Sequence, residues 1–143
     1  MTSDEHSEVN ETVEFFRACI GSADVWAGGP PFTRWLGGVL VERDEMANPA
    51  GLLHGGMQCA MLGDAVGLAA FTLGRDGFHL SINLATDYLA SAAVGATVRA
   101  TAEIARAGLR VVHASATLSD PDGRTLASAS SNLLWSPQTT TTV

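Results

Sequence analysis

The chain has 143 residues, 46% of them hydrophobic and 16% charged, which predicts one folded domain with a sizeable core rather than a disordered chain. Its formal net charge is -7 and no cluster of Lys or Arg occurs, so the composition argues against nucleic-acid binding. A small polyanionic ligand is not excluded, because a few local arginines can hold its phosphates.

The N-terminal part of the chain predicts a helix, a break and one strand. Residues 1–6 are polar and are expected to be disordered, and apolar residues recur at helical spacing from Ser7 onward. Gly28-Gly29-Pro30-Pro31 interrupts any regular element, and residues 35–43 are predicted to form a strand. The acidic N-terminus does not resemble a signal peptide, which predicts a cytoplasmic protein.

The most apolar stretch, residues 55–73, predicts a long helix that is buried on all sides. It carries Asp64 near its middle, and an ionised aspartate at mid-bilayer is costly, so we interpret the stretch as a core helix rather than a membrane span. Gly74 and Gly77 are expected to end it.

Four strand-like runs follow, and they predict an antiparallel meander. Turn-forming residues separate these runs, which cover residues 79–88, 97–106, 109–118 and 124–135. The order of elements predicts an α+β fold in a single domain, residues 7–136, with a loose tail at 137–143. A sheet of about five strands covers one side of such a helix, so loops or a second subunit must close the other side.

Four motifs occur in the chain: Asn48-Pro-Ala-Gly-Leu-Leu-His54-Gly55-Gly56, Ser81-Ile-Asn83-Leu-Ala-Thr-Asp-Tyr88-Leu, Arg106-Ala-Gly108-Leu-Arg110 and Asp-Gly-Arg124. Together they resemble the hotdog-fold thioesterases of the phenylacetic-acid-degradation type, over about residues 32–135. The resemblance implies a long helix wrapped by a curved antiparallel sheet, here with an extra N-terminal helix. It also implies a homodimer that often doubles to a tetramer, with active sites between subunits. Most members hydrolyse acyl- or aryl-CoA thioesters without a metal or a separate cofactor, since coenzyme A belongs to the substrate.

Thioester hydrolysis builds negative charge on the carbonyl oxygen, and a helix N-terminus offers free N–H donors to receive it. Gly55 and Gly56 allow a substrate to approach the backbone closely. The resemblance makes the Gly55 amide the oxyanion donor, with His54 beside it as a hydrogen-bond donor. One such donor is typically worth about 3 kcal/mol in the transition state. The alternative is a plain turn into a helix.

Three further residues resemble parts of the hydrolytic machinery. Asn48 resembles the residue that orients the attacking water, or it is an ordinary turn residue ahead of Pro49. Ser81 resembles the supporting hydroxyl, or it is an outward-facing strand serine. Asp64 is the candidate general base, because burial would raise its pKa toward a useful range.

Asp64 departs from the family pattern, in which the acid lies nine residues after the histidine, at the position of Gly63 here. One helical residue rotates a side chain by about 100°. Either the helix starts differently, the site is rebuilt around a shifted acid, or Asp64 is structural and hydrolysis is weak.

The coenzyme is expected to contact five positions by the same resemblance: Asn83, Tyr88, Arg106, Gly108 and Arg110. Guanidinium groups suit phosphate, although the arginines are equally consistent with a basic hairpin tip. His6, His79 and His113 show no metal-ligand spacing, so no metal site is predicted.

A second departure is that one N-terminal strand is expected to be shortened or missing, since only residues 42–47 separate the first strand from Asn48.

The main rival interpretation is a hotdog protein that binds acyl thioesters without hydrolysing them. A hotdog dehydratase is weaker, because Asp44 lies ten residues before His54 rather than about five. A serine hydrolase is disfavoured because no Gly-x-Ser-x-Gly motif occurs.

Overall fold

The structure is a computed structural model that describes residues 44–93 and 95–137. The predicted N-terminal helix, the predicted strand at 35–43, the segment 1–6 that was expected to be disordered, and residues 138–143 of the tail lie outside the described residues.

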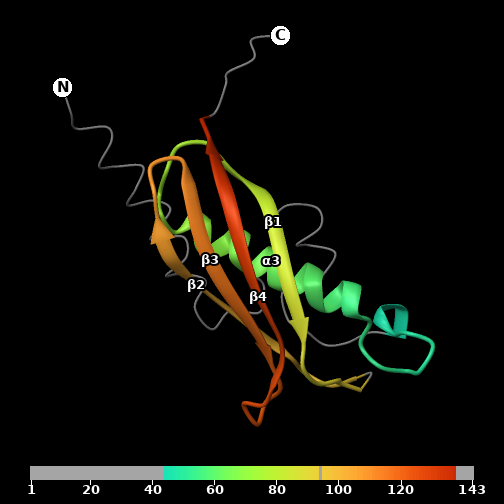
Figure 1. Ribbon diagram of the computed structural model, residues 1–143. Coiled ribbons are helices and arrows are strands. Elements are labelled where there is room, and N and C mark those ends of the chain that lie inside the picture. The colour runs from blue at the N-terminus through green and yellow to red at the C-terminus, as the bar shows by residue number, and fades with distance from the viewer. Residues whose placement is uncertain (1–43, 94, 138–143) are drawn as a thin grey trace, which may run out of the picture.

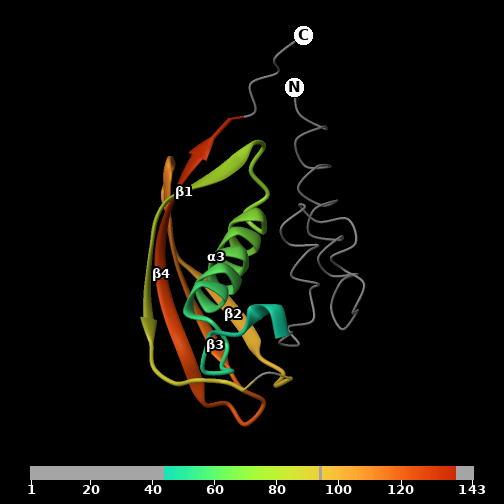
Figure 2. The same cartoon turned by 90° about the vertical axis from the view of Figure 1, so that its right-hand side faces the viewer.

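The described chain forms one long helix packed against one antiparallel sheet. After a short 3-10 turn, η2 (Asp44–Met46), the elements are α3 (Gly55–Phe71), β1 (Phe78–Tyr88), β2 (Arg99–Ala107), β3 (Val111–Ser119) and β4 (Thr125–Ser136). The strand order is β1-β4-β3-β2, so β1 and β2 are the two edges of the described sheet (Figure 1). The sheet curves around α3, which lies on its concave side (Figure 2). This arrangement confirms the predicted α+β hotdog fold, and the bounds of the helix and four strands agree with the predicted ones to within about two residues.

The sheet-facing side of α3 forms the core. Met61, Leu62, Val66 and Ala70 are at most 2% exposed and pack against leucines and valines of β3 and β4. Burying one such side chain contributes roughly 1.5–3 kcal/mol. Residues 57–70 of the helix are all buried or half-buried, and the exposed helix residues, Gly56 and Phe71, lie at its two ends. The described strands cover one side of the helix, so burial on all sides stays a prediction. A single curved sheet can cover only one side of a cylinder.

The predicted alternation along β1 is interrupted by a bulge between Ser81 and Asn83. Ser81 and Leu84 both lie opposite β4 residues that are buried against α3, so both face the helix. Leu80 and Asn83 consequently lie on the outer face of the sheet. One extra residue in a strand moves every later side chain to the other face, and the simple alternation could not show this.

Candidate active site

The segment that leads into α3 is a tight hairpin shaped by Asn48. The side-chain oxygen of Asn48 accepts hydrogen bonds from the backbone N–H groups of Ala50 (2.9 Å) and Leu52 (3.1 Å). Gly51 adopts a φ of 73°, which the turn requires and which glycine tolerates best. The side-chain oxygen of Asn48 therefore stabilises the turn, and only its side-chain NH₂ group is left to bind a water molecule.

His54 caps the start of α3. Its backbone is extended, and its Nδ1 accepts a hydrogen bond from the Gly56 N–H at 2.9 Å. Since Nδ1 is the acceptor, the neutral ring carries its proton on Nε2, and the exposed side chain presents that N–H as a donor. This geometry leaves the Nε2–H group available, and the donor role of His54 stays a prediction.

The Gly55 amide is the unused N–H at this helix start. The Gly56 N–H group donates to His54 Nδ1, and the Met57 and Gln58 N–H groups both donate to the carbonyl oxygen of His54. Among the described residues, nothing accepts a hydrogen bond from Gly55 N–H. A free amide at the positive end of a 17-residue helix is suited to bind a developing negative charge.

Tyr88 lies directly against Gly55. A Cβ placed on Gly55 would be 3.3 Å from Tyr88 Cε1 and 3.7 Å from its hydroxyl oxygen, so the ring touches the glycine. The Tyr88 side chain is 54% exposed. Partial burial raises the pKa of Tyr88 above its ordinary value, and the Cys59 sulfur adds to the rise through its charge and a hydrogen bond to the hydroxyl.

Cys59 and Thr86 complete this contact, and the sequence analysis missed both. The Thr86 hydroxyl donates to Cys59 Sγ at 3.5 Å. Cys59 lies one helical turn after Gly55, and Thr86 lies two strand residues before Tyr88. The helical period places Cys59 beside Gly55 and the strand period places Thr86 beside Tyr88, but only the packing of β1 on α3 brings the two pairs together.

Asp64 lies on a different side of α3 from the position of the family acid. A Cβ on Gly63 would meet Leu84 Cδ2 of β1 at 3.2 Å, so Gly63 faces the β1 edge of the sheet. Asp64 is rotated from Gly63 by about 100° and from the fully buried Leu62 by about 200°, so it faces away from the sheet of its own chain. Because α3 begins at Gly55, as the motif predicts, a different helix start does not account for the shift.

The catalytic candidates do not converge within one chain. Asp64 follows Gly55 by nine helical residues, which is about 14 Å along the helix. Ser81 faces α3, but it precedes Tyr88 by seven strand residues, which is about 23 Å along β1. Asn48, His54 and Gly55 thus form one group, while Asp64 and Ser81 lie farther along the helix.

The predicted phosphate-binding turn lies at the other end of α3. Arg75, just past the helix, donates to the carbonyl oxygens of Gly108 (2.8 Å) and Leu109 (3.4 Å). A Cβ on Gly108 would be only 2.6 Å from Val111 O, so the turn needs glycine here for a structural reason. The flanking Arg106 and Arg110 are exposed and open to a ligand.

Asn83 faces away from Tyr88, on the outer side of the sheet. Its side-chain oxygen accepts from the Asn132 backbone (3.2 Å) and side chain (2.9 Å), and Asn132 Oδ1 contacts His113 Nδ1 at 3.0 Å. Arg106 is in register with His113, so the four residues form a row across the strands. The predicted coenzyme contacts Asn83 and Arg106 therefore share a face that Tyr88 does not.

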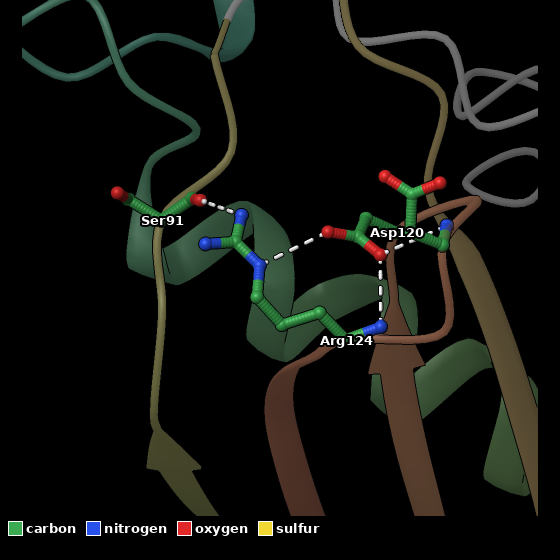
Figure 3. A network of polar contacts seen from close by, with 4 residues as sticks. Ser91, Asp120 and Arg124 are labelled. Carbon is green, nitrogen blue, oxygen red and sulfur yellow. Dashed lines mark hydrogen bonds and ion pairs between the residues drawn. The ribbon is translucent and has the colours of Figure 1, made fainter.

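A polar network holds the loop after β1. Arg124 binds the Asp120 carboxylate (Nε to Oδ2, 3.0 Å) and donates to the Ser91 carbonyl oxygen at 3.2 Å (Figure 3). The next residue of this loop, Ala92, accepts a hydrogen bond from Leu53 N–H at 3.0 Å. The Asp-Gly-Arg124 motif thus supports the backbone that immediately precedes His54.

No group of three or more His, Cys, Asp or Glu residues that could hold a metal occurs within residues 44–93 and 95–137. The ring nitrogens of His79 are buried and have no hydrogen-bond partner in this part of the chain, and burial, followed by the charge of Arg75, lowers the pKa of His79. In the same described ranges, no helix is both long enough and apolar enough to cross a membrane.

Comparison with solved structures found relatives of the same fold. A protein of Ralstonia eutropha JMP134, named as a candidate thioesterase related to phenylacetic acid degradation, is 33% identical over 66% of this chain and 70% of its own, with a TM-score of 0.61. A candidate esterase of Mycobacterium tuberculosis is 27% identical over 68% of this chain and 79% of its own (TM-score 0.63). A Streptococcus mutans protein bound to acetyl-CoA shares the fold at 18% identity, over 68% and 77% of the two chains (TM-score 0.63).

A search of curated proteins found no match. The family model for the thioesterase superfamily matches residues 50–127, which include the His54-Gly55-Gly56 turn, all of α3 and the first three strands of the described fold. The match covers more than half of the chain and agrees with the observed architecture, so this chain belongs to the thioesterase superfamily.

Proposed function

We propose that the chain is an acyl-CoA thioesterase of the phenylacetic-acid-degradation type, acting on a small acyl or aryl thioester. The observation that carries the proposal is the free Gly55 amide at the start of α3, with His54 fixed beside it by the bond from Gly56 N–H. The proposal is supported by the Ralstonia relative, which is named as a candidate thioesterase, and by the Streptococcus mutans protein of the same fold, which is bound to acetyl-CoA.

In this mechanism, a water molecule attacks the thioester carbonyl carbon while a carboxylate removes a proton from the water. The carbonyl oxygen becomes negative and accepts hydrogen bonds from Gly55 N–H and from His54 Nε2–H. The carbon–sulfur bond then breaks, and the coenzyme leaves as a thiolate that takes up a proton. Asp64 is the proposed carboxylate, and Asn48 and Ser81 are proposed to orient the water.

The separation of these groups along α3 supports a site built from two copies of the chain. Asp64 is about 14 Å along the helix from its own Gly55, which is too far for both to act on one carbonyl group. A second subunit would have to bring its Asp64 and Ser81 to the first subunit's Gly55. We therefore propose a homodimer as the smallest active unit, with a tetramer formed from two such pairs.

Strand β1 is the edge suited to this pairing. It exposes large apolar side chains, including Ile82 at 58%, whereas the β2 edge carries Arg99, Glu103 and Arg106. Protected edges usually carry charges, and an apolar edge is a site for strand pairing.

The test is hydrolysis of short, long and aromatic acyl-CoAs, followed through release of the coenzyme thiol. We expect turnover of at least one substrate, and we expect Asp64→Asn to lower kcat by about 100-fold or more with little change in KM, because the variant loses a general base. Equal kcat values for the wild type and Asp64→Asn would exclude Asp64 as that base.

A second candidate function, acyl-thioester binding without hydrolysis, is favoured by the observation that Gly63 replaces the family acid and Leu84 fills the adjoining space. Binding of acyl-CoA by calorimetry without turnover would support it. In that case Gly63→Asp should create activity, because the displaced contact is the flexible end of Leu84.

A further inference from the structure

We propose that Tyr88 is a specificity-determining residue, whose ring excludes acyl groups that are branched at the carbon next to the thioester carbonyl. The inference rests on the proposed thioesterase function and goes beyond it by naming the restricted part of the acyl group. It also gives Tyr88 a place beside the acyl group, whereas the sequence predicted a contact with the coenzyme.

The acyl carbon next to the thioester carbonyl lies a short distance from the Gly55 amide. An oxygen that accepts the Gly55 hydrogen bond lies about 2.9 Å from the nitrogen. The carbonyl carbon and the next acyl carbon follow within roughly another 2.7 Å. The Tyr88 ring lies close beside Gly55, since a Cβ built on the glycine would be only 3.3 Å from the ring, which leaves hardly room for one carbon atom between them. A substituent on that acyl carbon therefore meets the ring, whereas a linear chain can pass beside it.

The Tyr88 ring is restricted by its neighbours. It packs against the start of α3 at Gly55, and Cys59, one turn further along the helix, accepts a hydrogen bond from the Thr86 hydroxyl at 3.5 Å. Tyr88 is the last residue of β1, in register with the fully buried Ala127 of β4. A side chain discriminates between substrates only if it cannot move aside, and the strand pairing of the Tyr88 backbone and the packing of its ring on Gly55 restrict it.

The Tyr88 ring borders open space in the single chain. Tyr88 is 54% exposed although its ring lies against the helix start, and His54 and Gly56 beside it are also exposed. In the proposed dimer, a ligand between this surface and the second subunit would reach the Gly55 amide along the uncovered part of the ring.

The test compares butyryl-CoA with its branched isomer isobutyryl-CoA, which have the same atoms and the same leaving group. We expect the wild type to prefer butyryl-CoA in kcat/KM, and Tyr88→Ala to reduce that preference by about tenfold or more, as expected when a pocket gains room for one methyl group. Tyr88→Phe keeps the aromatic ring, so its preference for butyryl-CoA should stay within about threefold of the wild-type preference.

The matched control is Leu80→Ala, since Leu80 has the same 54% exposure on the same strand but faces the outer side of the sheet. It should leave the preference unchanged. If Tyr88→Ala has the wild-type preference, or if Leu80→Ala changes it equally, the inference is wrong while the thioesterase proposal stands.

A spectroscopic readout does not depend on turnover. Tyr88 is the only tyrosine in the chain, so the phenolate absorbance reports this residue alone. A non-hydrolysable butyryl-CoA thioether should raise the pKa of the Tyr88 phenol further, because the ligand covers the ring. An unchanged titration with bound analogue would overturn the inference, and failure to bind or hydrolyse any acyl-CoA would overturn the proposed function with it.

Discussion

The His54 ring lies close over the backbone of Gly56 at the start of α3. A Cβ on Gly56 would lie 3.0 Å from His54 Nδ1 and 3.2 Å from its Cε1, closer than such atoms normally approach. The same ring nitrogen accepts the Gly56 N–H. The absence of a side chain at residue 56 thus lets the histidine cap the helix and keep its Nε2–H directed outward.

We expect Gly56→Ala to lower kcat/KM by about 10- to 100-fold, because the new methyl group displaces the His54 ring and removes one oxyanion donor. Steady-state kinetics on the best acyl-CoA would measure the loss. Wild-type kinetics in the Gly56→Ala variant would show that the His54 ring position does not matter.

Gly67, on the same helix, is the control. No described atom lies within 4 Å of a Cβ built there. Gly67→Ala should raise the unfolding free energy by about 0.5–1 kcal/mol, since alanine is the better helix former, and should leave activity unchanged. Chemical denaturation would provide the value, and a loss of stability would mean that this face of α3 is covered.

At the scale of elements, Arg75 joins the end of α3 to the β2–β3 turn through the Gly108 and Leu109 carbonyl groups. We expect Arg75→Met to raise KM severalfold with kcat nearly unchanged, because the turn proposed to hold the coenzyme phosphates would loosen. Hydrogen exchange at residues 108–111 should accelerate. Arg99→Met, on the exposed β2 edge, is the control, and equal exchange in both variants would contradict the role of Arg75.

Asp120 stabilises the turn between β3 and β4 in its charged form. Hydrogen bonds from the Arg124 and Asp122 backbones and the Arg124 guanidinium group together hold its pKa below the ordinary value, with the Arg124 backbone bond the largest cause. A pKa that is lower in the folded than in the unfolded state adds stability above the unfolded value, and this is lost as pH falls through the folded value.

Asp120→Asn, which keeps one side-chain oxygen for the backbone bonds, should therefore be less stable than the wild type at neutral pH. The difference in unfolding free energy should shrink as the pH falls below the ordinary range of an aspartate. Denaturation curves at several pH values would test this, and a gap that is independent of pH would show that the charge contributes nothing.

At the scale of the whole molecule, the groups that the proposed reaction needs lie far apart within one chain. A second copy that pairs with the apolar β1 edge would bring them together. Ile82 is the extra residue of the β1 bulge, and Ala105 occupies the equivalent place in the β2 bulge at the opposite edge. Both side chains are exposed. These two positions therefore form a matched pair for testing which edge associates.

We expect Ile82→Glu to shift the particle mass measured by light scattering toward that of a monomer and to abolish turnover with it, because charge on an edge strand opposes pairing. Ala105→Glu should change neither. A dimer that persists in Ile82→Glu, or dissociates equally in Ala105→Glu, would exclude β1 as the pairing edge.

Local sequence patterns by themselves determined the helix and the four strands of the described fold. The apolar stretch after His54-Gly55 predicted α3, which begins at Gly55 as expected, and turn residues such as Gly123 delimited the strands. The same motif predicted the free Gly55 amide, because capping and helix-end chemistry depend on residues close together in the chain. The catalytic roles of Asn48, Asp64 and Ser81 and the coenzyme contacts remain predictions.

Tertiary structure alone decided which side chains meet. The bulge in β1 turned Ser81 toward α3 and Asn83 away from it, and strand pairing placed Tyr88 on Gly55 and Arg75 on the Gly108 turn. These contacts depend on how β1 is registered against β4 and α3, where a shift of one residue exchanges the two faces of a strand. Short-range periodicity carries no information about that register, because it arises between segments that are far apart in the chain.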